Sequence, residues 1–340
     1  MRNRFLPVIL AFFVLLACTR QGGERMFRKT TFAMDTMVTV TVVSKSEDKA
    51  GAAIEAAFRE IRRLERLLSF WTRDSEIAAI NREAGRSPVN VSPETLEIVE
   101  RALQVSRLTG GAFDPTIGPV IRLWDFRKKI KPGPEAVKEA LARVGYRAIE
   151  VDRQKRTVYL SRADMSFDTG GIAKGYAADK AVQVLKQKGI RAGLVSVAGD
   201  IRAFGTKPDG GAWSVGIRNP RPEAGGAGEN ELIAVLPLRD QAVSTSGDYE
   251  RYFIRNGVRY HHLLDPRTGY PARGLVSVTV VAPEAVLTDG LATGVFVMGR
   301  KKGLELLEKN GFEGVLVDEE GKRYVTAGLE GRIQWVSPKR

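Results

Sequence analysis

Apolar and polar positions follow two different periods along the chain, and each period predicts a type of element. In residues 37–43, β-branched side chains dominate and apolar positions alternate, which predicts a strand. In residues 49–68, apolar positions recur every three or four residues with arginine and glutamate between them, which predicts an amphipathic helix. A second helix is expected over residues 93–108, because Ser92 can cap its first turn and proline favours the position that follows.

The rest of the chain alternates short strands with helices. Because strands joined by short turns pair antiparallel, this order predicts an α+β fold with mixed, largely antiparallel sheets and packed helices. No repeat or clean domain boundary interrupts the pattern, which favours a single large domain of two intimately packed lobes. Residues 72–85, 109–119 and the hydroxyl-rich 244–251 are expected to be irregular. Hairpins are expected at 149–160, 252–264 and 314–326, further strands at 192–197, 213–217, 232–236 and 276–282, and helices at 134–144, 286–298 and 301–310.

The stretch from Phe167 to Gly189 joins a glycine-containing loop to a helical pattern. It has the sequence F-D-T-G-G-I-A-K-G-Y-A-A-D-K-A-V-Q-V-L-K-Q-K-G, and the final glycine is expected to end the helix. A glycine pair before a helix lets the backbone approach a ligand, and the unpaired N–H groups there suit a phosphate. Lys174, in the first turn, would add a positive charge. Taken alone, the loop is more simply explained as a helix N-terminus with a surface lysine.

Composition sets wide bounds on function. With 340 residues, 43% of them hydrophobic, the chain can bury a sizeable core. Its formal net charge is +13, but the 53 basic and 40 acidic residues are interleaved, with no long basic block. An acidic small molecule or an anionic membrane surface explains this excess as well as nucleic acid does.

The N-terminus has the order of a secretory signal. Arg2 and Arg4 form a basic start, residues 5–16 are apolar, and L-L-A precedes Cys18, the only cysteine. An apolar run this short is typical of a signal peptide rather than of a bilayer-spanning helix. The L-x-A-C ending resembles a bacterial lipobox, so we expect a lipoprotein signal peptide at 1–18, with Cys18 lipidated, and a tether at 19–29. The alternative is a cleaved signal with an incidental cysteine.

This N-terminus also predicts a location. The protein is expected to be exported, lipid-anchored to the membrane and facing the periplasm or the cell exterior. A nucleic-acid partner is not expected there, which agrees with the interleaved charges.

The chain has two histidines, and they are adjacent. His261 and His262 end a predicted strand, where neighbouring side chains point to opposite faces, so at most one of them faces a given site. A histidine can act as a base at neutral pH, but a structural histidine is as good an explanation from spacing alone. The turn D-P-R-T-G follows closely after them.

Oxygen ligands recur on one face of the expected helix at 286–298. Asp289 and Thr293 are four residues apart, so both side chains project from the same face. A carboxylate and a hydroxyl, helped by a backbone carbonyl, suit magnesium. The plainer explanation is a favourable carboxylate near the helix start and a packed threonine. Gly290 in this apolar helix needs a reason, and close approach by another backbone is one.

A series of short motifs runs along the chain from residue 34 to about 298. The motifs are M-D-T at 34–36, S-F-W at 69–71 with D-S-E at 74–76 and Asn81, G-A-F-D-P at 111–115, L-W-D-F at 123–126, D-T-G-G-I-A-K-G-Y-A at 168–177, G-D-I-R at 199–202, S-G-D-Y at 246–249, residues 262–269 and residues 289–293. No single motif is unique, but their order and spacing are specific. Taken together, these stretches resemble the bacterial FAD:protein FMN transferases.

The resemblance implies an enzyme whose substrate is FAD and whose cofactor is Mg²⁺. It would transfer the FMN moiety to a threonine or serine hydroxyl of an acceptor flavoprotein, in phosphoester linkage, and release AMP. The acceptor would be a redox-pump subunit in the membrane or a secreted flavoprotein that carries a Ser/Thr flavinylation motif. The catalytic domain would span residues 30–335.

The resemblance also implies roles for individual residues. Asp289, Thr293 and the carbonyl of Gly171 would bind Mg²⁺, and His262 would be the base that activates the acceptor hydroxyl. Residues that would line the FAD site are Met34, Trp71, Ala112, Phe113, Asp114, Asp168, Lys174 and Leu263.

Two departures and two alternatives accompany this interpretation. Asp35 stands where the family usually has glycine, and residues 125–127 replace a usual Gly-Phe-Gly. The same site could act as an FAD pyrophosphatase that yields FMN and AMP. A non-catalytic flavin-binding lipoprotein is the other alternative, although it has no use for a base.

Overall fold

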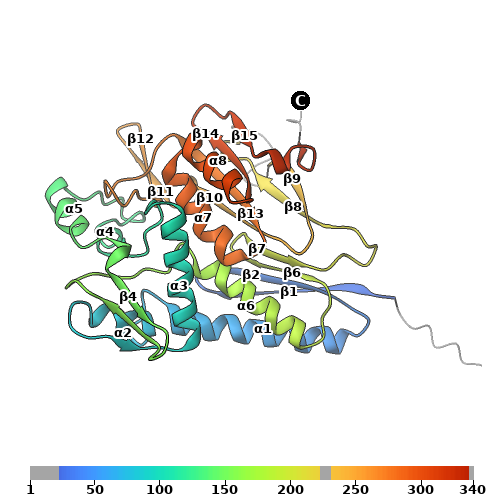
Figure 1. The fold of residues 1–340 in the computed structure, drawn as a ribbon. Coiled ribbons are helices and arrows are strands. Elements are labelled where there is room, and N and C mark those ends of the chain that lie inside the picture. The colour runs from blue at the N-terminus through green and yellow to red at the C-terminus, as the bar shows by residue number, and fades with distance from the viewer. Residues whose placement is uncertain (1–22, 223–230, 337–340) are drawn as a thin grey trace, which may run out of the picture.

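A computed structural model describes residues 23–222 and 231–336. Its centre is an eight-stranded sheet with the order β1-β2-β6-β7-β10-β13-β14-β15, in which every neighbouring pair is antiparallel (Figure 1). The strands are β1 (Arg25–Ala33), β2 (Thr36–Ser44), β6 (Gly193–Val197), β7 (Asp200–Phe204), β10 (Ala242–Gly247), β13 (Leu275–Ala282), β14 (Glu313–Asp318) and β15 (Arg323–Val325).

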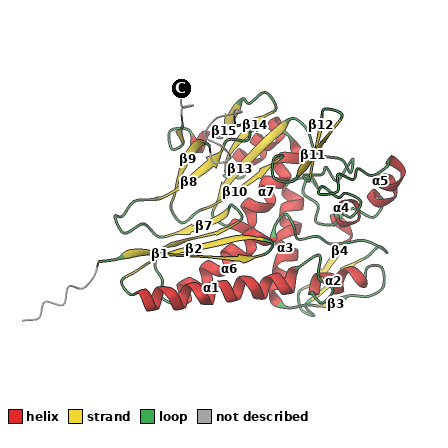
Figure 2. Cartoon of the chain, turned by 180° about the vertical axis from the view of Figure 1, so that it is seen from behind, coloured by secondary structure: helices red, strands yellow, loops and turns green. Residues whose placement is uncertain are grey.

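Each face of this sheet carries its own core. On β2, the alternating Val38, Val40 and Val42 are fully buried beneath the helices. Val43, on the opposite face, packs in a second cluster beneath a three-stranded sheet. Figure 2 shows the same layers from behind. The helices are α1 (Glu47–Leu68), α6 (Ala173–Gln187), α7 (Ala285–Met298) and α8 (Arg300–Lys309), and the second sheet consists of β8 (Trp213–Arg218), β9 (Leu232–Leu238) and β16 (Gln334–Trp335).

The long helices begin and end where the sequence predicts. The hydroxyl of Ser46 caps α1 by accepting from the N–H of Lys49, and Ser92 caps α3 (Pro93–Leu108) in the same way. Gly189 follows α6 with a φ of 73°, a conformation that glycine adopts without strain. The expected antiparallel α+β architecture is therefore confirmed.

Helices α6 and α7 touch through their backbones. A Cβ atom on Gly175 would lie 2.1 Å from the carbonyl oxygen of Ala285, so only glycine fits at this crossing. At Gly290, the atoms nearest to an added Cβ belong instead to the side chain of Val105 on α3, at 3.0–3.4 Å. The contact at Gly175 thus brings α6 and α7 together one turn from the loop that precedes α6.

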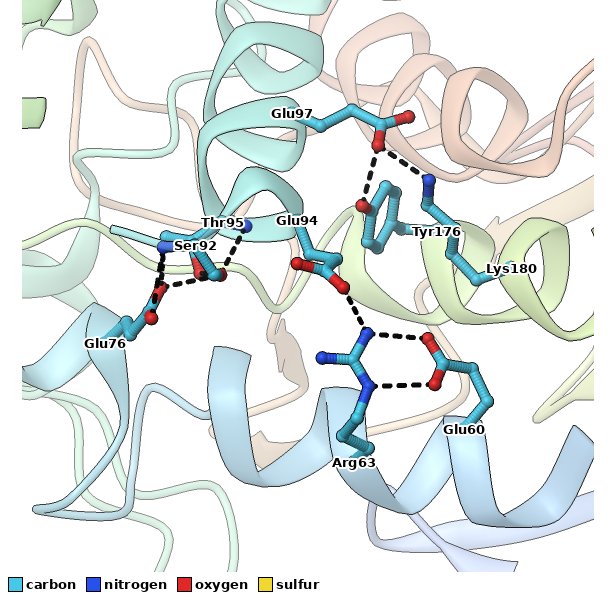
Figure 3. A network of polar contacts seen from close by, with 9 residues as sticks. All are labelled: Glu60, Arg63, Glu76, Ser92, Glu94, Thr95, Glu97, Tyr176 and Lys180. Carbon is cyan, nitrogen blue, oxygen red and sulfur yellow. Dashed lines mark hydrogen bonds and ion pairs between the residues drawn. The ribbon is translucent and has the colours of Figure 1, made fainter. Parts of the chain in front are cut away.

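A polar network joins α1, α3 and α6 (Figure 3). Arg63 donates two hydrogen bonds of 2.8 Å to Glu60 and also pairs with Glu94. Glu97 accepts from the hydroxyl of Tyr176 at 3.0 Å and from the ammonium of Lys180 at 2.7 Å. We call these six side chains the helix-layer network.

Smaller elements surround the helix layer, and several differ from the sequence expectation. The helix expected at 134–144 ends at Leu141. Helix α2 lies in a stretch expected to be irregular, where the hydroxyl of Ser75 caps it. Residues 244–247, expected to be a turn, belong to strand β10. These elements are α2 (Glu76–Arg82), β3 (Val89–Asn90), α4 (Gly118–Ile121), α5 (Pro134–Leu141), η1 (Tyr146–Ala148), β4 (Ile149–Asp152), β5 (Thr157–Leu160), β11 (Tyr252–Arg255), β12 (Val258–His261) and η2 (Ala327–Leu329).

The structure describes only the last part of the segment expected to be a signal peptide and a tether. Residues 25–29, expected to belong to a tether, instead form part of β1, which pairs with β2 along its whole length. Residues 1–18, including Cys18, lie outside the described residues. Among the helices that the structure describes, none is both long enough and apolar enough to cross a membrane.

Candidate active site

Two tight turns mark the end of the central sheet where the candidate residues gather. The β1–β2 turn is Met34-Asp35 and the β6–β7 turn is Ala198-Gly199, and all four residues have φ between 54° and 101°. Two-residue hairpin turns favour this left-handed backbone, which aspartate tolerates better than most residues. Asp35 can therefore replace the glycine usual in the family. The N–H of Ala198 donates to the carbonyl of Met37, so the turns lie side by side.

The loop from Asp168 to Ile172 is fixed beside these turns. Thr169 donates its hydroxyl to the carbonyl of Leu68 at the end of α1, and the amide of Asn81 bonds both polar backbone groups of Phe167. Gly171 is wedged in place, because a Cβ there would lie 3.2 Å from the ring of Phe113 and 3.4 Å from Oγ1 of Thr293. The loop therefore lies against α7 directly before α6 begins.

Lys174 stands between two buried carboxylates. Its Nζ lies 2.8 Å from Oδ2 of Asp200 and 3.9 Å from Oδ1 of Asp289. Burial alone would lower the pKa of Lys174, but the two carboxylates outweigh it and raise that pKa. Burial and repulsion from Asp200 raise the pKa of Asp289. We call these three residues the acid–lysine cluster.

Asp200 was not among the predicted site residues. The sequence signal was available, because the motif G-D-I-R at 199–202 belongs to the resemblance, but no pattern indicated that its carboxylate meets Lys174. Asp200 is the first residue of β7, and it is only 5% exposed.

The predicted metal ligands Asp289, Thr293 and Gly171 are brought together around the start of α6. Oδ2 of Asp289 accepts from the N–H of Gly175 at 2.9 Å, which leaves Oδ1 on the side of Lys174. Oγ1 of Thr293 lies 3.2 Å from the hydroxyl of Ser246 on β10 and beside Gly171. The local donors are therefore oxygens only, as Mg²⁺ prefers. Within residues 23–222 and 231–336 no three His, Cys, Asp or Glu side chains form a metal-binding group, so carbonyl and hydroxyl oxygens would complete the set.

The two histidines have separate roles, as their alternation predicts. His261 is buried and its Nε2 lies 3.0 Å from the carbonyl of Ala272, so it supports the chain locally. Nδ1 of His262 is buried and has no hydrogen-bond partner among the described residues. Burial, together with the positive charges of Arg251 and Lys174, lowers the pKa of His262 to about 3. His262 is therefore neutral at pH 7, as a base must be.

Positive charge surrounds this histidine and the loop. Burial raises the pKa of Asp168, and the charges of Arg122 and Arg251 oppose that rise. Arg251 thus acts on both Asp168 and His262, although its predicted place was only a hydroxyl-rich turn. The main chain also joins the two sides, because the N–H of His262 donates to the carbonyl of Arg251 at 3.1 Å. An anionic ligand is favoured here.

The other residues predicted to line the flavin site differ in exposure and in how many of their polar groups are already hydrogen-bonded. Trp71 is 69% exposed and packs edge-on against Phe70, so its ring can stack on a planar group. Met34 is held by its N–H, which donates to Glu65. Both oxygens of Asp114 already accept hydrogen bonds from Thr116 and Tyr146, which gives this residue a part in shaping the loop. Ala112, Phe113 and Leu263 are buried.

The fold and the site together define a class of α+β proteins, in which an acid–lysine cluster and a neutral histidine lie at one end of an antiparallel sheet. Within that class, the chain belongs to the ApbE family, whose model matches residues 34–316.

Named relatives agree with this assignment. The chain is 36% identical over 336 residues to the FAD:protein FMN transferase of Treponema pallidum, covering 94% of this chain and 91% of that one. It is 33% identical over 282 residues to the enzyme of the same name from Escherichia coli, covering 81% and 77% of the two chains. The ApbE protein of Thermotoga maritima superposes with a TM-score of 0.83 at 34% identity, over 91% of this chain and 99% of that one. The resemblance inferred from the motifs is thereby confirmed.

Proposed function

We propose that this protein transfers the FMN moiety of FAD to a hydroxyl group of an acceptor protein. Relatives named FAD:protein FMN transferase align with 94% and 81% of the chain. The observation that carries the proposal within this structure is the buried Nδ1 of His262, which has no hydrogen-bond partner among the described residues, on a chain segment whose N–H donates to the carbonyl of Arg251. A base beside positive charge suits attack by a hydroxyl on a pyrophosphate.

Mg²⁺ is proposed as the cofactor, because the donor set fits it. Asp289, Thr293 and the carbonyl of Gly171 would hold the ion, and the 3.2 Å hydroxyl contact between Ser246 and Thr293 orients one of these donors. When bound, the ion would neutralise negative charge on the pyrophosphate. The buried carboxylates of the acid–lysine cluster exceed its single ammonium by one, which is a charge imbalance that a cation would offset.

The chain's own residues supply the remaining steps. His262 accepts the proton of the acceptor hydroxyl as its oxygen forms a bond to the FMN-side phosphorus. The bond from that phosphorus to the bridging oxygen breaks, and AMP leaves with this oxygen. Lys174 and the N–H groups before α6 stabilise the charge on the phosphates, since donors fixed in advance need no rearrangement during the reaction.

The exposed Trp71 and the turn at Met34-Asp35 are proposed to border the flavin. Trp71 offers a free ring face at the end of α1, near the loop that Thr169 ties to the same helix end. Stacking on an aromatic ring would orient the flavin without consuming any of the polar groups that bind phosphate.

Export and lipid anchoring are also proposed. Support comes from the basic and apolar order of residues 2–16 and from the L-x-A-C sequence that ends at Cys18. The acceptor would then be a redox-pump subunit or secreted flavoprotein with a Ser/Thr flavinylation motif, reached at the membrane facing the periplasm or cell exterior. Mass spectrometry of the mature N-terminus, compared with Cys18→Ser, tests the anchor. An unmodified Cys18 in the membrane-associated protein would contradict it.

Transfer itself is tested by weighing the acceptor. The full chain, purified in detergent, is incubated with FAD and an acceptor domain that carries the motif, with either Mg²⁺ or EDTA. The expected result is a Mg²⁺-dependent mass gain of one phosphoester-linked FMN on the acceptor, with one AMP released. Free FMN and AMP without a mass gain would indicate a pyrophosphatase instead, and unchanged FAD would leave only a binding protein.

A further inference from the structure

Lys174 lies asymmetrically between the two carboxylates of the acid–lysine cluster. The distance from Nζ to Oδ2 of Asp200 is 2.8 Å, whereas Oδ1 of Asp289 is 3.9 Å away. The first is a hydrogen-bonded ion pair, and the second is at the limit of an ion pair. Oδ1 of Asp289 therefore faces an ammonium that is held by a different residue.

The sheet fixes Asp200 in this place. It begins β7 directly after the Ala198-Gly199 turn, and it pairs with Val197 on the neighbouring strand β6. The neighbouring strand β10 continues the sheet on the other side of β7. Because strand and turn both constrain the backbone, the carboxylate of Asp200 is a rigid anchor for the flexible lysine side chain.

We propose that Asp200 is a positioning residue that draws the Lys174 ammonium away from Asp289 and so keeps Oδ1 of Asp289 available to a divalent cation. Nothing in the relatives' names assigns this residue a role. The inference rests on the proposed magnesium site. Without Asp200, Asp289 becomes the nearest carboxylate to Lys174, and the ammonium then competes with the metal for the same oxygen.

Charge arithmetic gives the inference a distinctive signature. Two carboxylates and one ammonium carry a net charge of −1, from −2 + 1. Asp200→Asn brings the cluster to zero and releases the lysine, Lys174→Met brings it to −2, and the double variant restores −1 without a competitor. Charges about 4 Å apart in a partly buried site interact strongly enough to change affinity at least about tenfold.

The experiment measures Mn²⁺ binding to the full chain without FAD, by the electron paramagnetic resonance signal of free Mn²⁺, and Mg²⁺ by competition. Asp200→Asn is expected to weaken Mn²⁺ binding about tenfold or more, and Lys174→Met to strengthen it. The double variant is expected to return close to the wild-type affinity. A larger gain from Lys174→Met in the Asp200→Asn background than in the wild type is the mark of a direct interaction between the two residues, because independent effects would simply add.

A matched control is available on the same pair of elements. Asp179 on α6 pairs with Arg202 on β7 at 3.2 Å, which reverses the arrangement of Lys174 and Asp200. Asp179→Asn removes a comparably buried acid, keeps a side-chain oxygen that can accept from the N–H groups of Ala285 and Val286 at the start of α7, and should leave Mn²⁺ affinity unchanged. Thermal denaturation of each variant checks that the fold persists.

Four results would overturn the inference. Wild-type affinity in Asp200→Asn would show that Lys174 does not compete for Asp289. A double variant that binds as weakly as Asp200→Asn would show that Asp200 acts through the structure alone. If Asp200→Asn does not fold, unchanged or weaker binding by Lys174→Met overturns it equally. Failure of the wild type to bind Mn²⁺ would instead overturn the magnesium site, and this inference with it.

Discussion

Two lysines on α6 have carboxylate partners, and their surroundings differ. Lys180 pairs with Glu97 of the helix-layer network, whose side chain is 40% exposed. Lys174 pairs with Asp200 and faces Asp289, whose side chains are 7% and 6% exposed. Water solvates the first pair and screens it, whereas the second lies where an unbalanced charge is costly.

This difference distinguishes the helix-layer network, which stabilises the fold, from the acid–lysine cluster, which we propose takes part in function. In the helix-layer network, Arg63 balances carboxylates at the edge of the helices, so the contacts link α1, α3 and α6 with little desolvation (Figure 3). In the acid–lysine cluster, one buried carboxylate remains without its own cation. Retaining that imbalance costs stability, which makes sense if a ligand offsets it.

The largest expected effect lies at the base. His262→Gln should reduce FMN transfer about 10²- to 10⁴-fold, the usual contribution of a general base, while FAD affinity stays the same. Mass spectrometry of the acceptor and fluorescence titration of FAD measure the two quantities. Lys180→Met in the helix-layer network is the control and should transfer at the wild-type rate. Equal rates for the wild type and His262→Gln would remove the histidine from the mechanism.

Asp289→Asn should separate activity from stability. We expect transfer to fall about 10²-fold or more, because a metal ligand is lost. Stability without metal at pH 8 should be unchanged or higher, because the raised pKa of Asp289 means that folding disfavours the charged carboxylate. Activity assays and thermal denaturation test both parts. Glu97→Gln should show the reverse, with full activity and a slightly lower melting temperature.

Acidification should destabilise the folded protein through the buried His261. Burial lowers the pKa of His261 to about 4, whereas an unfolded histidine titrates near about 6.5. Between these values the unfolded chain binds more protons, so stability falls as the pH drops below 6.5. The stability advantage of the wild type over His261→Gln should therefore shrink by about 1.2 kcal/mol between pH 7 and 5.5. Denaturant titrations at both pH values measure it, and an unchanged difference would contradict the lowered pKa.

The smallest effect is expected in the helix-layer network. Arg63→Met should lower the free energy of unfolding by about 1 kcal/mol, because partly exposed ion pairs contribute little. Added salt should shrink that loss, and FMN transfer should be unaffected. A loss of activity comparable to that of Asp289→Asn would break the distinction between the two groups.

Much of the fold could be predicted because its elements are long and strongly periodic. Helices α1, α3 and α7 and strands β2 and β13 follow clear apolar patterns. Strand β10 escaped prediction because Ser244 and Thr245 are polar, and their hydroxyls bond to Thr288 and Thr279 only after the layers pack. Helix α2 is a short element whose start depends on a single capping serine.

The site was predictable where a motif places its residues close together in sequence. Asp289 and Thr293 share a helix face, and Lys174 follows its loop directly. Asp200 could not be assigned, since its contact with Lys174 depends on how β7 sits beneath α6. Likewise, sequence alone could not reveal that both oxygens of Asp114 are engaged by Thr116 and Tyr146.

Because Gly175 contacts Ala285, tolerance to substitution should change sharply between residues 174 and 175 of α6. At position 174, a saturation library should recover folded but inactive chains, because many side chains fit where the lysine lies. At residue 175, a Cβ atom would lie only 2.1 Å from the carbonyl oxygen of Ala285. The N–H of Gly175 also donates a hydrogen bond to Asp289. Loss of folding and loss of catalysis therefore coincide at residue 175, and no second-site substitution of a side chain can restore one without the other.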